Sequence, residues 1–212
     1  RMTQAKQEAP HFYLTMSIDM TRAMDVRKEL NADLAEGGTK VSVNDLILVA
    51  SARSLRDHPE CNARFDGDKS VRYGNVHLGL AVAVDDGLIV PALRHADQKS
   101  IKAIAAEARD LGLRARDKKL RPEEMSGSTF TVSNLGMFGI HAFSAVVNPG
   151  EGAILAVGGV EETPVVRDGQ VVVRKVMKVT LSCDHRVIDG ALGAEFLAAI
   201  AGNLENPLAM LA

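Results

Sequence analysis

The amino-acid sequence predicts an α/β protein, with a mixed β-sheet and helices packed against it. Stretches with strand-like alternation and stretches with helical spacing follow one another along all 212 residues. They do not alternate strictly as strand and helix, which an all-parallel sheet with crossover helices would require. The length suits one large domain with a core of its own. We therefore expect one α/β domain.

The chain opens with a polar segment and then a strand. Residues 1–9 are polar and precede Pro10, so we expect them to be the end of an interdomain linker or a frayed helix. The domain itself is then predicted to cover residues 10–212. Apolar and polar residues alternate over Phe12–Met20, which is the period of a half-buried strand.

Two helices are predicted next. Apolar residues recur at helical spacing from Ala23 to Ala35, and a Gly-Gly pair follows, where a helix stops. Ser42 is a candidate N-cap with Asp45 three residues later, which is a capping-box pattern. The second helix is expected to run until Pro59.

The middle of the chain combines short strands and a third helix. Residues 76–93, "VHLGLAVAVDDGLIVPAL", contain two β-rich runs separated by Asp85-Asp86-Gly87, and the first run is apolar enough to be buried. A helix is predicted from Ser100 to Lys119, with one apolar stripe and with charges that we expect to be solvated.

The C-terminal part is predicted to hold the longest strands. "GSTFTVSN" indicates a strand, and "LGMFGI" a glycine-punctuated loop. "GAILAVGGV" is expected to be buried, and "VVRDGQVVV" predicts a hairpin that turns at Asp168-Gly169. The strand "VMKVTLSCDH" and a helix over Gly190–Leu204 complete the pattern.

Composition excludes several classes of function. The chain carries 25 basic and 27 acidic residues, so it lacks the basic character of nucleic-acid-binding proteins. Its apolar runs are too short for a membrane helix, and no signal-peptide pattern opens it. Cys61 and Cys183 are too few and too far apart for a disulfide framework or a structural zinc site. We expect an intracellular protein with reduced thiols and no metal.

The stretch "TLSCDHRVIDGALGAEF" concentrates reactive side chains. It places Cys183, Asp184, His185, Arg186 and Asp189 between an apolar run and a helix-like segment. On a strand, Cys183 and His185 are expected to share one face. Four interpretations remain open from these residues alone: a metal site, a thiol–imidazole nucleophile, a general base acting on an external nucleophile, and a strand end with an Asp189–Arg186 ion pair.

The general-base interpretation has a definite chemical basis. An alkyl thiol has a pKa of about 8.5, so a neighbouring base that removes its proton contributes roughly 10²- to 10⁴-fold. Acyl transfer to such a thiol also needs a donor for the oxyanion, and the hydroxyls and amides of "TFTVSNLGMFGI" are candidates. Spacing alone does not bring these two segments together.

Several motifs resemble one family in the same order along the chain. "CDHRVIDG" resembles the His-Arg-x-x-Asp-Gly signature of the dihydrolipoamide acyltransferases, the core subunits of 2-oxoacid dehydrogenase complexes. The resemblance covers residues 10–212 and implies an α/β two-layer sandwich similar to chloramphenicol acetyltransferase, active as a trimer. The other motifs that carry it are "PHFYLTMSID", "KVSVNDLILVASARSL", "GLIVPALRHAD", "TFTVSNLGMFGIHAFSAVVNP", "AILAVGG" and "NPLAMLA".

The resemblance implies a role for three residues. His185 matches the catalytic base of the family, and Ser133 matches the hydroxyl that stabilises the oxyanion. Asp189 matches the signature aspartate, which holds the active-site loop through a charged partner, either Arg186 or a more distant arginine. Asp189 also precedes a helix and is a candidate N-cap. In the family the base of one chain serves the hydroxyl of its neighbour.

The implied reaction is acyl transfer between the dihydrolipoyl thiol and coenzyme A, both as substrates, without metal. "SNLGMFGI" is most similar to the acetyl-transferring branch of the pyruvate dehydrogenase complex. Alternatives are a branched-chain or succinyl specificity, a non-catalytic scaffold subunit, and a free-standing acetyltransferase. No lipoyl-lysine motif occurs in the sequence, so the lipoyl group is expected on another domain.

The resemblance also implies partners and a place in the cell. Homotrimers are expected to join into a cubic or dodecahedral core that meets lipoyl domains, the decarboxylase and the dihydrolipoamide dehydrogenase. The location is then the bacterial cytoplasm or the mitochondrial matrix. In the apolar tail "NLENPLAMLA", Met210 or Leu211 is expected to insert into a pocket on a neighbouring trimer. The alternative is that the tail folds back onto the core of its own chain.

Overall fold

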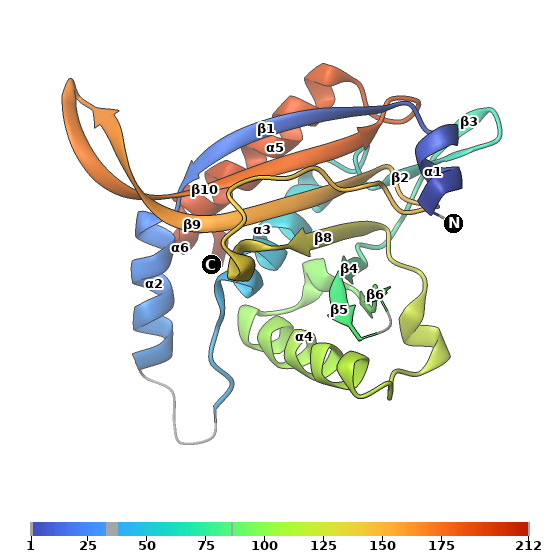
Figure 1. Ribbon diagram of the computed structural model, residues 1–212, viewed down its shortest axis with the longest axis horizontal. Helices are drawn as coiled ribbons and strands as arrows, with labels where there is room; N and C mark the ends of the chain where they lie inside the picture. The colour runs from blue at the N-terminus through green and yellow to red at the C-terminus, as the bar shows by residue number, and fades with distance from the viewer. Residues whose placement is uncertain (1, 33–37, 86, 212) are drawn as a thin grey trace.

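A computed structural model describes residues 2–32, 38–85 and 87–211. Its central feature is a mixed sheet whose six described strands lie in the order β1-β10-β9-β8-β4-β7 (Figure 1). Strand β8 runs parallel to both of its neighbours, and the remaining pairs are antiparallel. The strands are β1 (His11–Asp19), β2 (Ala63–Asp66), β3 (Lys69–Arg72), β4 (Leu78–Leu80), β5 (Val82–Val84), β6 (Gly87–Ile89), β7 (Ala92–Leu93), β8 (Phe130–Asn134), β9 (Ala153–Arg167) and β10 (Gln170–Asp184).

Helices form a second layer against this sheet. Helices α3 and α5 pack on one another and lie behind the sheet in the view of Figure 1. The side chains between the two layers make the core, in which the rings of Phe130 and Phe196 contact each other edge to face. The helices are α1 (Met2–Glu8), α2 (Thr21–Ala32), α3 (Val43–Asp57), α4 (Ile101–Arg116), α5 (Gly190–Glu205) and α6 (Pro207–Leu211), with short 3₁₀ turns η1 (Ala96–Gln98), η2 (Pro122–Met125) and η3 (Gly136–Phe138).

The predicted N-terminal elements are confirmed. Ser42 caps α3, because its Oγ accepts from the Asp45 N–H at 3.2 Å while the Asp45 carboxylate accepts from the Ser42 N–H at 2.7 Å. Helix α2 ends within the described residues at Ala32, and the predicted continuation to Ala35 lies outside them. Residues 2–8 are helical, and the linker boundary at residue 9 stays a prediction.

Residues 76–93 differ from the two runs that the sequence predicts. They form four short strands, and only β4 and β7 join the large sheet. Strands β5 and β6 pair with each other as a separate hairpin, which leaves Val82 and Val84 half-buried and Ala83 exposed. The predicted burial is therefore right for β4 and wrong for β5. Asp86 of the predicted turn lies outside the described residues.

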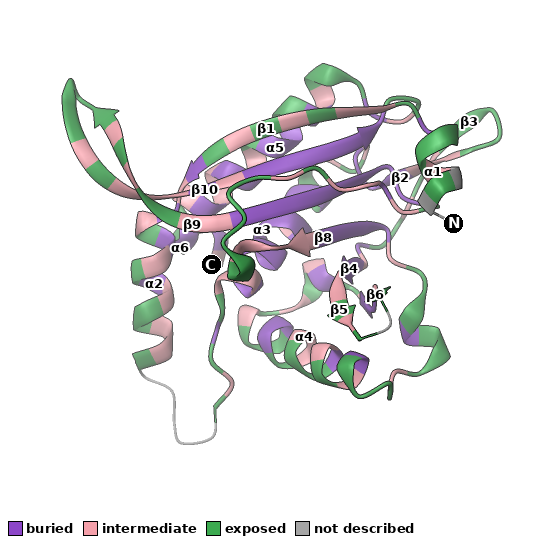
Figure 2. Cartoon of the chain, in the orientation of Figure 1, coloured by how far each residue is buried: buried purple, intermediate pink, exposed green. Residues whose placement is uncertain are grey.

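Strands β9 and β10 form one long hairpin. Asp168 and Gly169 both have positive φ, 50° and 75°, as a two-residue turn between twisted strands requires. The strands are buried where β1 and β8 flank them, and exposed where the hairpin projects from the body (Figure 2). Val166, Val171 and Val173 are exposed on this projection.

The C-terminal tail folds back on its own chain. Pro207 begins the short helix α6, and Met210 is only 1% exposed within the core next to α2, α3 and α5. The expectation that Met210 inserts into a neighbouring trimer is therefore wrong, because its own core already buries it. Leu211 is half-buried against the same core. None of the described helices is long and apolar enough to cross a membrane.

Candidate active site

Ser133 lies near the end of β8 at the edge of a cavity of about 880 Å³. Its side chain is half-buried, and β8 is held between β4 and β9 by parallel pairing. The walls of the cavity are largely apolar, and Asn44 and Asn134 bring amide groups to it. Asn134 donates to the Asn44 side chain at 3.1 Å, which joins β8 to the start of α3. Ser133 thus lines a space large enough for part of a substrate.

Glycines hold the loop after Ser133 against β9. A Cβ at Gly136 would lie 2.7 Å from the Gly158 carbonyl oxygen, and a Cβ at Gly158 would lie 2.2 Å from that of His141. Only glycine permits such backbone-to-backbone approach. The Gly136 N–H also donates to Asn134 Oδ1 at 2.9 Å. The loop is therefore fixed at the mouth of the cavity, although Phe138 within it is 64% exposed.

His185 follows the end of β10 in a turn. The Val187 and Ile188 N–H groups both donate to the Asp184 carbonyl at 3.0 Å, so the chain leaves the strand direction at Asp184. The His185 side chain is exposed, and its ring contacts the Phe12 ring at 4.9 Å between centroids. The backbone N–H of His185 donates to the Pro10 carbonyl at 2.9 Å. An accessible imidazole is thereby held at one end of the sheet.

Cys183 lies two residues before His185, at the end of β10. Phe12 is the cross-strand partner of Cys183 and its ring contacts the His185 ring, which agrees with the predicted shared face. Cys183 is fully buried, and burial raises the pKa of its thiol to about 12. A protonated, inaccessible thiol is inert as a nucleophile. The structure thus gives no support to the thiol–imidazole interpretation.

The acidic residues of the signature have different partners from those expected. Arg186 forms a double contact with the buried Asp184, at 2.7 Å from Nη2 and 3.0 Å from Nε, and lies on the Phe65 ring. The proposed Asp189–Arg186 pair is therefore wrong, because Asp184 occupies the guanidinium. Asp189 is the N-cap of α5 and accepts from the Leu192 N–H at 2.9 Å. Its capping role was predicted.

The structure does not bring Ser133 and His185 of one chain together. Across β9, Ser133 is level with Thr180, and His185 lies five residues further along. Roughly 16 Å of strand and about 10 Å of sheet width therefore separate them. Any site that uses both groups at once needs His185 from another copy of the chain.

Glu151 is a further polar residue near both segments, and no sequence pattern indicates it. Its side chain is 5% exposed, and its Oε1 accepts from Ser128 Oγ at 2.6 Å and Thr131 Oγ1 at 2.9 Å. Within the part of the chain that the structure describes, Oε2 is buried without a hydrogen-bond partner. Burial raises the pKa of this carboxyl to about 7. Its hydrogen-bond donors come from segments that only the fold brings together.

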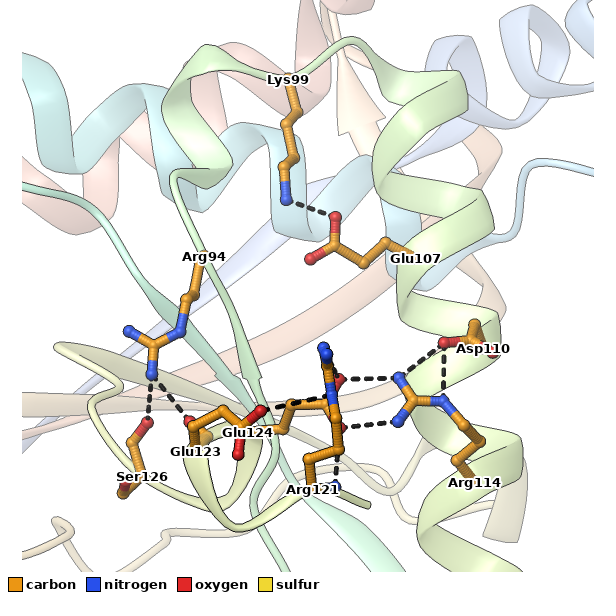
Figure 3. A network of polar contacts seen from close by, with 9 residues as sticks. All are labelled: Arg94, Lys99, Glu107, Asp110, Arg114, Arg121, Glu123, Glu124 and Ser126. Carbon is orange, nitrogen blue, oxygen red and sulfur yellow. Dashed lines mark hydrogen bonds and ion pairs between the residues drawn. The ribbon is translucent and has the colours of Figure 1, made fainter. Parts of the chain in front are cut away.

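An ion-pair network holds the segment that leads into β8 (Figure 3). The Arg114 guanidinium of α4 donates to both carboxylate oxygens of Glu124, at 2.6 and 2.9 Å, and Arg121 donates to the same carboxylate at 2.9 Å. Arg94 donates to the carbonyls of Glu123 and Ser126 from the other side. The polar face of α4 was predicted to be only solvated; that is wrong for Arg114, which anchors the approach to β8.

A metal site finds no support in the described residues. No group of three or more His, Cys, Asp or Glu side chains among them is arranged to hold a metal ion. The groups near Ser133 are its hydroxyl and the amides of Asn44 and Asn134, and those near His185 are its imidazole and the paired guanidinium of Arg186. This set suits acid–base chemistry and oxyanion stabilisation at an acyl group.

Comparison with known proteins matches the whole chain to one family. The model of the 2-oxoacid dehydrogenases acyltransferase (catalytic domain) matches residues 1–212. The dihydrolipoyllysine-residue acetyltransferase component of the pyruvate dehydrogenase complex from Rickettsia bellii is 43% identical over 100% of this chain. The match spans 51% of that relative, so this chain covers about half the length of the curated relatives.

Solved structures agree in fold. The dihydrolipoamide acetyltransferase of Azotobacter vinelandii is 37% identical with a TM-score of 0.95, over 100% of this chain and 88% of that one. A structure described as the cubic core of the pyruvate dehydrogenase multienzyme complex gives the same identity, TM-score and coverage. Chloramphenicol acetyltransferase, 17% identical with a TM-score of 0.56, shares the fold. The predicted fold class is confirmed.

Proposed function

This chain belongs to the 2-oxoacid dehydrogenase acyltransferase family as its catalytic domain, and we propose on that basis that it transfers an acetyl group between dihydrolipoamide and coenzyme A. The observation that carries the proposal is that the chain presents both an accessible imidazole, His185 at the end of β10, and a hydroxyl, Ser133 at the edge of the 880 Å³ cavity. Acetyl specificity is supported by the names of the similar proteins, from Rickettsia bellii and Azotobacter vinelandii.

In the proposed mechanism, His185 takes the proton from the coenzyme A thiol. The thiolate attacks the carbonyl carbon of S-acetyl-dihydrolipoamide, and Ser133 donates a hydrogen bond to the oxyanion that forms. Collapse of this intermediate breaks the bond to the dihydrolipoamide sulfur, which receives the proton back from His185. The acetyl group ends on coenzyme A, and no covalent enzyme intermediate forms.

The separation of Ser133 from His185 supports a site shared between subunits. We propose a homotrimer in which His185 of one copy faces Ser133 of the next. The exposed Met137 and Phe138 lie on the loop beside Ser133 and would be covered by such a contact. Assembly into a cubic core is proposed by analogy with the similar structure described as the cubic core of the pyruvate dehydrogenase multienzyme complex. The expected partners are lipoyl domains, the decarboxylase and the dihydrolipoamide dehydrogenase.

The test is steady-state transfer between free dihydrolipoamide and a panel of acyl-CoA donors. His185→Ala is expected to lower kcat by roughly 10²- to 10⁴-fold with KM changed only a few-fold, because the base acts in the transition state. Ser133→Ala is expected to lose about 10²- to 10³-fold. Cys183→Ala is the matched control and should remain active.

Three outcomes would count against the proposal. Near-normal turnover in a folded His185→Ala variant would remove His185 from the mechanism. An acetylated protein that forms from acetyl-CoA alone and disappears in Cys183→Ala would show covalent transfer instead. A preference for branched-chain or succinyl donors would overturn the acetyl assignment while keeping the reaction class.

A further inference from the structure

Glu151 occupies the junction between the strand of Ser133 and the turn of His185. It follows the Asn148-Pro149-Gly150 turn and lies two residues before the start of β9 at Ala153. Its own N–H donates to the Asn148 carbonyl at 3.0 Å, which closes the turn. The side chain lines a second cavity of about 910 Å³, distinct from the one beside Ser133. The family signature and the mechanism above leave this buried carboxyl unused.

The hydrogen bonds of Glu151 have a defined direction. Asn148 Nδ2 donates to Thr131 Oγ1 at 2.8 Å, so the single hydroxyl proton of Thr131 is available for Glu151 Oε1. Ser128 donates its hydroxyl proton to the same oxygen. A Cβ at Gly79 would lie 2.4 Å from Thr131 Oγ1, so the opposite wall closes on the hydroxyl as well. The carboxyl therefore fixes the start of β8 through two side chains.

The same residue is one step from the His185 turn. The next residue, Gly152, accepts from the Asp184 N–H at 2.9 Å, and a Cβ at Gly152 would lie 2.6 Å from the Ala63 carbonyl oxygen. The backbone after Glu151 is thus wedged between β2 and the end of β10. Asp184 in turn accepts the two N–H groups that shape the turn of His185.

We propose that Glu151 is a positioning residue for acyl transfer, fixing the strand of Ser133 through Thr131 and the turn of His185 through Gly152. Thr131 and Ser133 are two residues apart on β8 and point to the same face, so a displacement of one is passed to the other. The inference rests on the proposed function. Because one chain supplies Ser133 and His185 to different sites, Glu151 aligns two sites at once.

The charge of Glu151 is itself poised to change near neutral pH. Burial raises its pKa to about 7, and the side chains that oppose this rise, Ser128, Thr131 and Asn148, are neutral. The ionised carboxylate accepts both hydroxyl protons, whereas the protonated acid is the weaker acceptor. The charged groups that line the same cavity are Glu8, Arg64, Asp184 and Arg186, and the adjoining loop contacts His11 and Tyr73.

The experiment compares the assembled full-length protein with Glu151→Gln, a nearly isosteric neutral variant. We expect kcat to fall by about 10- to 100-fold with KM within about two-fold, since small misplacements of catalytic groups cost this much. On its acid side, the kcat–pH profile of the wild type should show two ionisations, one of the base and one of Glu151 near pH 7. The profile of Glu151→Gln should show only that of the base. Thr131→Val should lower kcat in the same way, and Thr131→Ser, which keeps the hydroxyl, should restore it.

Amide hydrogen exchange supplies a readout that does not depend on turnover. Glu151→Gln is expected to raise exchange at residues 131–133 and 184–188 while the melting temperature of the rest of the domain is kept. An unchanged kcat and pH profile, or equal effects of Thr131→Val and Thr131→Ser, would overturn the proposal. If the wild type itself transfers no acetyl group, the proposed function fails, and unchanged exchange in Glu151→Gln then overturns the positioning role separately.

Discussion

Glu124 and Glu151 are both buried, 7% and 5% exposed, and their surroundings act on them in opposite directions. Glu124 accepts hydrogen bonds from the guanidinium groups of Arg114 and Arg121, which hold the pKa of its carboxyl far below the ordinary value. Glu151 has only hydroxyl and amide donors, and burial raises its pKa to about 7. Charged hydrogen-bond partners decide the protonation state of Glu124, and burial decides that of Glu151. The first carboxylate is a permanent anchor, and the second can titrate.

The largest expected effect is a pH dependence of stability that comes from Glu151. Its pKa is about 7 when folded and close to the ordinary 4.5 when unfolded, so between these values the folded state holds the extra proton. The stability that it contributes is therefore full below about pH 4.5 and is lost as pH rises through 7. At about 1.4 kcal/mol for each pKa unit, the free energy of unfolding should fall by about 3 kcal/mol.

Urea unfolding across this pH range measures the effect. Glu151→Gln should lack this fall, so the difference between the wild type and the variant isolates the contribution of this group. A wild-type profile that is parallel to that of Glu151→Gln would mean that Glu151 stays ionised when folded, and the contrast with Glu124 would disappear.

Glu124→Gln tests the other side of the comparison. Removing the charge from a carboxylate held by two guanidinium groups should cost about 2 kcal/mol at neutral pH, the scale of charge-assisted hydrogen bonds. Because the folded pKa is lowered, this stability is present above about pH 4.5 and is lost as pH falls further. Thermal unfolding at neutral and acid pH measures both.

The neighbouring Glu123 is the matched control. Its side chain is 62% exposed and lies 3.5 Å from Arg121, so Glu123→Gln should change stability by at most about 0.5 kcal/mol. Equal losses of unfolding free energy in Glu123→Gln and Glu124→Gln would show that the hydrogen bonds of Glu124 to Arg114 and Arg121 add no stability.

The smallest expected effect concerns Asp189, an exposed carboxylate whose described hydrogen bond goes to a backbone N–H. Asp189→Ala should cost about 1 kcal/mol of stability, and Asp189→Asn, which keeps the cap, only a few tenths. Chemical denaturation of both variants separates capping from charge. A loss in Asp189→Asn as large as in Asp189→Ala would indicate an ion pair with an arginine.

Features set by neighbouring residues could be predicted from the sequence. The alternation of β1, the capping box of Ser42 and Asp45, and the Asp168-Gly169 turn are local, and all three are confirmed. The family motif likewise directed attention to His185 and Ser133, whose catalytic roles stay predictions.

Features that depend on segments far apart in the chain could not be predicted. Glu151 meets Ser128 and Thr131 because β8 and β9 pair in parallel, and no local pattern marks that meeting. Met210 packs into the core of its own chain, where α6 contacts α2, α3 and α5, and no local pattern in the tail marks those contacts. Each of these features depends on tertiary contacts that the local sequence pattern does not contain.

The pairing of β1 with β10 has a consequence for synthesis of the protein. Strand β1 ends at Asp19 and its partner β10 begins at Gln170, so about 150 residues lie between β1 and the strand that completes its hydrogen bonds. At roughly 5 to 20 residues per second, a ribosome needs about 8 to 30 s to make that stretch. During this time the backbone amide and carbonyl groups of β1 that later pair with β10 lack their native hydrogen-bond partners. Strand β10 can pair at once with β9 through its two-residue turn, and the finished hairpin is then the template onto which the waiting β1 docks.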